Sequence, residues 1–230
     1  MKKLLTAATA ALIMAAAPAA SAQAGTDAPS TLQKVSVFYD LNTLYPKGAD
    51  NTYFNGFGVG YSIDFRVADE LPLYVGTGLD ARFLFNSRTI LDDTEFNLIN
   101  VKAKSTFINF NVPINVSYRV PVADGFYLTP QLGLDFRVQA YGHSSLDADN
   151  VSLVSPQLDE IIAETHDGIN LFSDKDMGSE KLRRFQMGWH AGVNFEYNRF
   201  NLGLSYGTDF VKLHKDLGAS HFLVSLGYSF

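Results

Sequence analysis

The sequence predicts an all-β fold, an eight-stranded antiparallel up-and-down transmembrane β-barrel. Apolar and polar residues alternate with a period of two along most of the chain, and the connections between these segments are short and long in turn. No stretch beyond the N-terminal region approaches 18 consecutive apolar residues, which argues against a transmembrane helix there. The mean hydropathy of +0.01 therefore averages two opposite faces. The absence of cysteine excludes disulfides, cysteine-ligated metals and a thiol nucleophile.

The first 24 residues have the features of a secretory signal peptide. Lys2 and Lys3 precede an apolar stretch at 4–17, and Ala22-Gln23-Ala24 fits the small-x-small cleavage rule. We expect cleavage after this motif. Removal of the two lysines changes the formal net charge from −6 to −8, which argues against nucleic acid as a partner.

A single barrel domain is predicted at 33–230, after a short periplasmic segment at 25–32. Between residues 57 and 67 all odd positions are apolar, whereas the even positions are glycine, serine or charged, as in a strand with two unlike faces. Pro113 and Pro130 lie inside predicted strands, and bulges are expected there because proline lacks a ladder donor. The predicted strands are 35–41, 57–67, 73–85, 108–120, 126–140, 185–197, 200–210 and 222–230.

The lengths of the connections distinguish the two ends of the barrel. Short periplasmic turns and longer extracellular loops are typical of membrane barrels. The longest connection, at about 143–183, would be unusual in an ordinary compact domain. The short turns are 68–70, 121–125 and 198–199, and the longer connections are those around 45–50, 86–104, 143–183 and 212–220.

The polar faces distinguish a membrane barrel from a lipocalin-like periplasmic barrel, which would place its apolar residues inside. They carry many glycines and asparagines but no lysine in the middle of any strand, which suits a crowded interior. Aromatic residues gather near the strand ends of the apolar faces, as in interfacial girdles. We therefore predict that the apolar faces contact lipid.

The last strand carries the most specific pattern, an alternation of large apolar residues that ends in phenylalanine. The whole pattern resembles the small outer-membrane barrels of the OmpA/OmpX type and the broad outer-membrane β-barrel domain family that includes PorT-like proteins. This resemblance implies a bacterial outer-membrane protein, with membrane lipid and, during biogenesis, the barrel assembly machinery as partners. The residues similar to the signal that this machinery recognises are Phe222, Val224, Leu226, Tyr228 and Phe230.

Charged residues recur on the faces predicted to line the lumen. Three Asp-x-Arg pairs place an acid and a base on one strand face, and Arg119 and Glu196 bring the count to four of each sign. Since a buried charge needs a partner, we expect an ion-pair network that plugs the lumen; a solute path lined by these charges is the alternative. The predicted layer near the short turns is Asp64, Arg66, Arg119 and Glu196, and the layer at mid-height is Asp80, Arg82, Asp135 and Arg137.

We predict no catalytic residue, no metal ligand and no cofactor. His190 is expected to point into the lumen network. His143 and Ser144 are adjacent and have no evident acid partner, so a polar loop is favoured over a lipid hydrolase. Asp209 and His214, near a predicted rim, resemble the Asp/His pair of outer-membrane proteases, but those barrels have more strands. Nine acidic residues in the longest connection favour a solvated loop over a divalent-cation site.

Three functional hypotheses follow. The favoured one is a non-enzymatic outer-membrane barrel whose loops act in surface contact, adhesion or a secretion or envelope complex. The second is a small porin-like channel. The third is a barrel enzyme that modifies lipid A or cleaves proteins.

Overall fold

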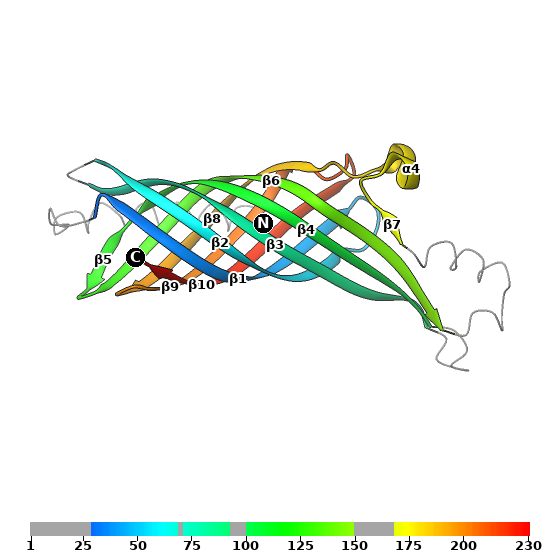
Figure 1. Ribbon diagram of the computed structural model, residues 1–230, viewed down its shortest axis with the longest axis horizontal. Coiled ribbons are helices and arrows are strands. Elements are labelled where there is room, and N and C mark those ends of the chain that lie inside the picture. The colour runs from blue at the N-terminus through cyan, green and yellow to red at the C-terminus, as the bar shows by residue number, and fades with distance from the viewer. Residues whose placement is uncertain (1–28, 69–70, 93–99, 150–167) are drawn as a thin grey trace.

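The structure confirms the predicted fold class. The computed structural model describes residues 29–68, 71–92, 100–149 and 168–230, so the predicted signal peptide at 1–24 lies outside the described residues. Eight long antiparallel strands form the barrel (Figure 1). They are β1 (Thr31–Pro46), β2 (Thr52–Ala68), β3 (Leu71–Asp92), β4 (Asn100–Tyr118), β6 (Phe126–Asp149), β8 (Phe185–Tyr197), β9 (Phe200–Val211) and β10 (Leu217–Ser229).

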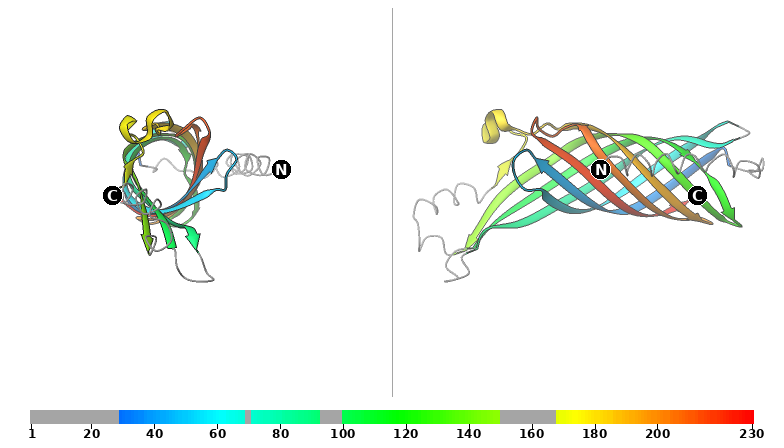
Figure 2. Two further views of the ribbon diagram at one scale, coloured as in Figure 1. Left: turned by 90° about the vertical axis from the view of Figure 1, so that its right-hand side faces the viewer. Right: turned by 180° about the vertical axis from the view of Figure 1, so that it is seen from behind.

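Two pairings between strands that are not consecutive in the chain close the barrel. β1 pairs with β10 from Lys34↔Ser229 to Pro46↔Leu217, and β4 pairs with β6. The remaining long strands pair with their sequence neighbours, so the topology is up-and-down. A short strand, β5 (Val120–Ala123), follows β4 and pairs with β6. Figure 2 shows the resulting ring end-on.

Several strands are longer than predicted. β3 continues to Asp92 and β6 to Asp149, and the two pair with β4 past the ends of their other neighbours (Figure 1). Residues 143–149 are therefore strand and not the beginning of the longest connection. Hydrophobic alternation stops where strands leave the lipid, but backbone pairing does not depend on it, so the sequence pattern underestimates strand length.

The prediction of bulges at Pro113 and Pro130 is wrong. The register of β4 on β6 passes through Pro113↔Asp135 without a shift, and β6 pairs regularly with β8 at Pro130↔Val193. Beside Pro113 the ladder to β3 is interrupted, as expected where a donor is missing, yet the register is retained. The shift between β4 and β6 lies instead between Ile108 and Asn109.

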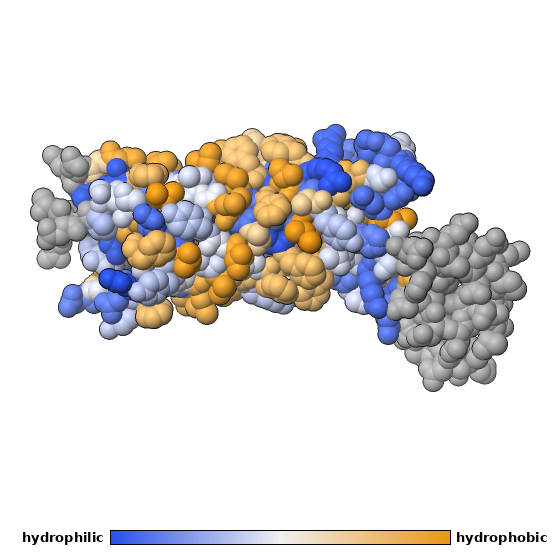
Figure 3. Space-filling model, viewed as in Figure 1, coloured by the Kyte–Doolittle hydropathy of each residue, from blue (hydrophilic) through white to orange (hydrophobic). Residues whose placement is uncertain are grey.

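The alternating faces are oriented as predicted for a membrane barrel. Large apolar side chains such as Val37, Phe57 and Leu226 are more than half exposed on the outer surface. Figure 3 shows such residues across the middle of one face, with hydrophilic residues gathered at the end with the long connections. Among the described residues, no helix has the length and hydropathy needed to cross a membrane.

The inward face is crowded, and glycine makes the crowding possible. A Cβ atom at Gly133 would lie 2.5 Å from Asn115 Oδ1 and 2.7 Å from His190 Cε1, so a larger residue there would displace lumen side chains. Small residues on this face leave the interior to the longer polar side chains of facing strands.

Candidate functional site

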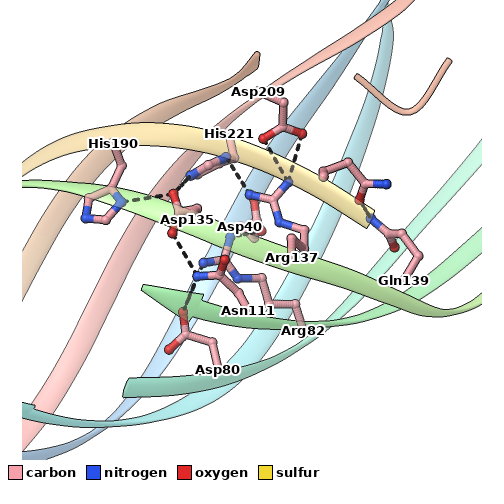
Figure 4. Close-up of polar contacts among 11 residues, drawn as sticks. Asp40, Asp80, Arg82, Asn111, Asp135, Arg137, Gln139, His190, Asp209 and His221 are labelled. Atoms are coloured by element: carbon pink, nitrogen blue, oxygen red, sulfur yellow. Dashed lines mark hydrogen bonds and ion pairs between the residues drawn. The ribbon is translucent and has the colours of Figure 1, made fainter. Parts of the chain in front are cut away.

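Polar side chains from β1, β3, β4, β6, β8, β9 and β10 converge inside the barrel at mid-height (Figure 4). Each occupies an inward position of the two-residue alternation, so strands distant in sequence bring their charges to one place. All but Asp80 are buried. We call this set the lumen core: Asp40, Asp80, Arg82, Asn111, Asp135, Arg137, His190, Asp209 and His221.

Arg82 joins two carboxylates of the lumen core. Its Nη2 donates to Asp80 Oδ2 at 3.0 Å, and its Nη1 lies 3.5 Å from Asp40 Oδ2. The guanidinium carbon also lies 5.5 Å from the centre of the Phe38 ring, within cation–π distance. β3 therefore contacts β1 across β2 through a single side chain.

Asp135 is the central acceptor of the lumen core. Its Oδ1 accepts a hydrogen bond from Asn111 Nδ2 at 2.8 Å, and its Oδ2 lies 2.9 Å from His190 Nδ1 and 3.6 Å from His221 Nε2. These partners come from β4, β8 and β10. One carboxylate thus links three strands besides its own.

Arg137 forms the opposite side of the lumen core. Its Nη1 lies 3.2 Å and 3.5 Å from the two carboxylate oxygens of Asp209, and its Nη2 lies 3.2 Å from His221 Nδ1. Asp209 is thus a buried partner in the lumen. The structure does not bring it together with His214, which lies 3.5 Å from Glu180.

The lumen core contains more acidic than basic side chains. Four aspartates face two arginines, with two histidines beside Asp135 and Arg137. The core is therefore electrically neutral only when two further protons are held among its carboxylates and imidazoles. The balanced count in the sequence omitted Asp40 and Asp209, because the first strand is weakly patterned and Asp209 lies near a predicted strand end.

A second polar cluster lies toward the short turns. Arg119 Nε donates to Glu196 Oε2 at 2.8 Å, and Thr129 Oγ1 donates to Glu196 Oε1 at 2.6 Å. The Arg119 guanidinium also lies 3.3 Å from the centre of the Tyr127 ring. This cluster connects the junction between β4 and β5 with β6 and β8 near the short turns.

Asp64 and Arg66 lie on β2 at the same end of the barrel, and both are half-buried. Arg66 Nε donates to the Leu71 carbonyl at 3.2 Å, across the turn from β2 to β3. The structure does not place these two residues in the lumen core. Of the eight predicted lumen charges, the core contains Asp80, Arg82, Asp135 and Arg137, and the second cluster contains Arg119 and Glu196.

Apolar side chains form a buried cluster at the end of the barrel with the long connections. We call this group the apolar cap, and its buried members are Phe54, Leu84, Phe107 and Phe172. Phe107 lies edge-to-face with both other rings, at centroid distances of 5.4 Å to Phe54 and 6.3 Å to Phe172.

Phe172 is the buried member of the cap that belongs to none of the eight long strands. It follows the short strand β7 (Ile169–Asn170), which pairs with β6, and precedes the helical turn α4 (Asp174–Met177). The Arg184 guanidinium lies 4.7 Å from the centre of its ring. The longest connection therefore sends one side chain back into the lumen, which the sequence did not reveal.

The structure does not form a nucleophile–base pair from His143 and Ser144. The His143 ring stacks on Tyr141 at 5.8 Å, and Ser144 Oγ is hydrogen-bonded to Ser105 Oγ at 3.0 Å. Within the described parts of the chain, no group of three or more histidine, aspartate or glutamate side chains is arranged to hold a metal ion.

A closed barrel with an apolar outer face and a polar interior defines an integral outer-membrane β-barrel protein. The chain belongs to the family described as outer membrane protein beta-barrel domain, whose sequence profile matches residues 5–230. Its location is the bacterial outer membrane. No curated protein matches the chain in sequence.

Solved structures similar to this chain are small outer-membrane barrels of different kinds. The attachment invasion locus protein Ail of Yersinia pestis, in complex with a heparin analogue, is 12% identical over 88% of this chain and 100% of its own, with a TM-score of 0.38. Neisserial surface protein A is 12% identical over 86% and 97%, with a TM-score of 0.44. The outer-membrane enzyme PagL is 10% identical over 82% and 98%, with a TM-score of 0.38. No specific role for this chain follows from these likenesses.

Proposed function

We propose that this protein is a non-enzymatic outer-membrane barrel with a closed lumen, and that its extracellular connections act in contact with a surface or envelope partner. The observation that supports the closed lumen is the stack of three groups along the barrel interior. The Arg119–Glu196 cluster, the lumen core and the apolar cap lie in succession from the short turns to the long connections. An eight-stranded barrel leaves room for little besides such side chains.

The closed lumen predicts an absence of conductance. Purified, folded protein inserted in planar bilayers is expected to give no single-channel steps above the baseline, because buried ion pairs and the cap occupy the cross-section at successive heights. An established porin in the same bilayers is the positive control. Reproducible steps from the folded protein would instead support the small-channel alternative.

The proposed contact function predicts that capture of a partner depends on the longest connection. Replacing residues 150–167 with a glycine–serine linker of equal length keeps β6 to Asp149 and keeps Phe172 in the chain. Cross-linked pull-down from the cell's own outer membranes is expected to recover a partner with the intact protein and to lose it with this variant.

The matched control replaces residues 93–99, in the connection between β3 and β4, in the same way. Equal recovery from the intact protein and from the 150–167 variant would contradict a contact role for this connection. The enzymatic alternative has its own readout, since a lipid A-modifying barrel would change the mass profile of lipid A when it is deleted.

A further inference from the structure

The outer surface of the barrel is hollowed along β1. An open groove of about 640 Å³ runs over Val35 and Val37, and it is lined almost entirely by apolar side chains. β1 contributes two valines to this groove; two tyrosines stand beside the first, Val35, and Val59 and Leu226 stand beside the second, Val37. The other lining residues are Ser36, Val59, Gly60, Tyr61, Leu79, Ala81, Phe200, Leu226, Gly227 and Tyr228.

The strand register explains the shape of this groove. Val35 is paired with Tyr61 on β2 and with Tyr228 on β10, so a short side chain stands between two tyrosines. Phe200 lies beyond Tyr228 and packs edge-to-face on it at a centroid distance of 5.6 Å. Val37, the next outward residue of β1, continues the floor toward the middle of the barrel. The groove is thus bounded by tyrosines on both sides of Val35 and by aliphatic side chains on both sides of Val37.

The end of the groove nearest the short turns is polar and cationic. The Tyr61 hydroxyl donates to Gln33 Oε1 at 2.9 Å, and Arg199 Nη1 donates to the Tyr228 hydroxyl at 3.2 Å. Arg199 belongs to the turn between β8 and β9 and is exposed. No carboxylate among the described residues pairs with it, so this exposed cation lacks an anionic partner within the described part of the chain.

We propose that this groove binds one phospholipid of the periplasmic leaflet, with an acyl chain over Val35 and Val37 and the phosphate group against Arg199. The short turns place this end at the periplasmic face, where the leaflet consists of phospholipids. A guanidinium matches a phosphate in charge and in donor geometry, and tyrosines are typical of the interface level. Burial of acyl carbons in the groove adds contacts that a convex barrel wall does not offer.

The experiment is native mass spectrometry of the detergent-solubilised, folded barrel titrated with palmitoyl-oleoyl phosphatidylglycerol. The intact protein is expected to retain one lipid preferentially. Arg199→Gln is expected to lower the affinity for this first lipid about threefold, as for an exposed ion pair, and Arg199→Lys to retain most of it. Val37→Trp, which fills the floor, is expected to abolish preferential retention.

Ile114→Trp is the matched control, because Ile114 is likewise lipid-facing but lies on β4, outside the groove. The proposal is overturned if Ile114→Trp and Val37→Trp have the same effect, or if lipids bind in a continuous distribution without a preferred first site. Palmitoyl-oleoyl glycerol, which lacks the phosphate, should bind the intact protein and Arg199→Gln equally. Inorganic phosphate should not displace the lipid; displacement would show a site for the free anion.

Discussion

Replacement of Arg82 with leucine is expected to lower the free energy of unfolding by about 3–5 kcal/mol, because it leaves Asp40 and Asp80 buried or half-buried without their cation. The measurement is urea unfolding in lipid vesicles, followed by the fluorescence of Trp189, the single tryptophan. A double variant, Arg82→Leu with Asp40→Asn, should recover part of the loss because it removes one of the two orphaned charges.

Arg88 provides the matched control on the same strand. Its side chain is 56% exposed and lies 4.0 Å from an exposed carboxylate of Asp50, so Arg88→Leu should change stability by less than about 1 kcal/mol. If the Arg82 and Arg88 variants unfold at the same urea concentration, the ion pairs of the lumen core do not stabilise the barrel. If Arg82→Leu does not fold at all whereas Arg82→Lys folds normally, this result would also show that the ion pairs of Arg82 stabilise the barrel.

Truncation of Phe172 to alanine is expected to release the cap without unfolding the barrel. A buried phenylalanine contributes about 3–5 kcal/mol relative to alanine, and here that contribution holds the segment from β7 to Leu182 against the lumen. The barrel ladder does not depend on it. Hydrogen exchange of the Leu171 and Leu182 amides, which donate to Gly142 and Leu171, should accelerate by about 100-fold or more.

Phe185→Ala is the matched control for this prediction, because Phe185 is a lipid-facing residue at the start of β8. It should leave exchange at Leu171 and Leu182 unchanged. Unchanged exchange in Phe172→Ala as well would mean that backbone pairing alone fixes the segment. Since the lumen core lies below the cap, Phe172→Ala is also expected not to conduct ions.

The fold could be predicted from the sequence because lipid and lumen impose opposite demands on successive residues. The strands around Phe57 and Leu226 show this alternation clearly. The partners within the lumen could not be predicted in the same way. Whether Arg82 meets Asp40 depends on the tilt and register of strands, and these depend on backbone pairing that leaves no local mark in the sequence.

Two further misses have specific causes. The sequence predicts Asp209 near a rim because it lies next to the end of its apolar alternation, but in the structure it pairs with Arg137 inside the barrel. Phe172 lies in a polar, acidic stretch of the sequence. The adjacent Leu171 is the feature that could have indicated burial, because two neighbouring large apolar residues are not needed in a solvated loop. A role in closing the lumen could be recognised only once the strands were in place.

The composition of the lumen core has a consequence for how the barrel is assembled. Arg137 and His221 are 84 residues apart, and Arg82 and Asp40 are 42 apart, so neither contact forms within a single hairpin. An open sheet that lacks the contact between β1 and β10 would leave His221 and Asp40 on separate edges, with their partners hydrated. The last step of closure therefore removes water from several charges at once. Insertion should be strongly cooperative, with few stable partial barrels between the open sheet and the finished ring.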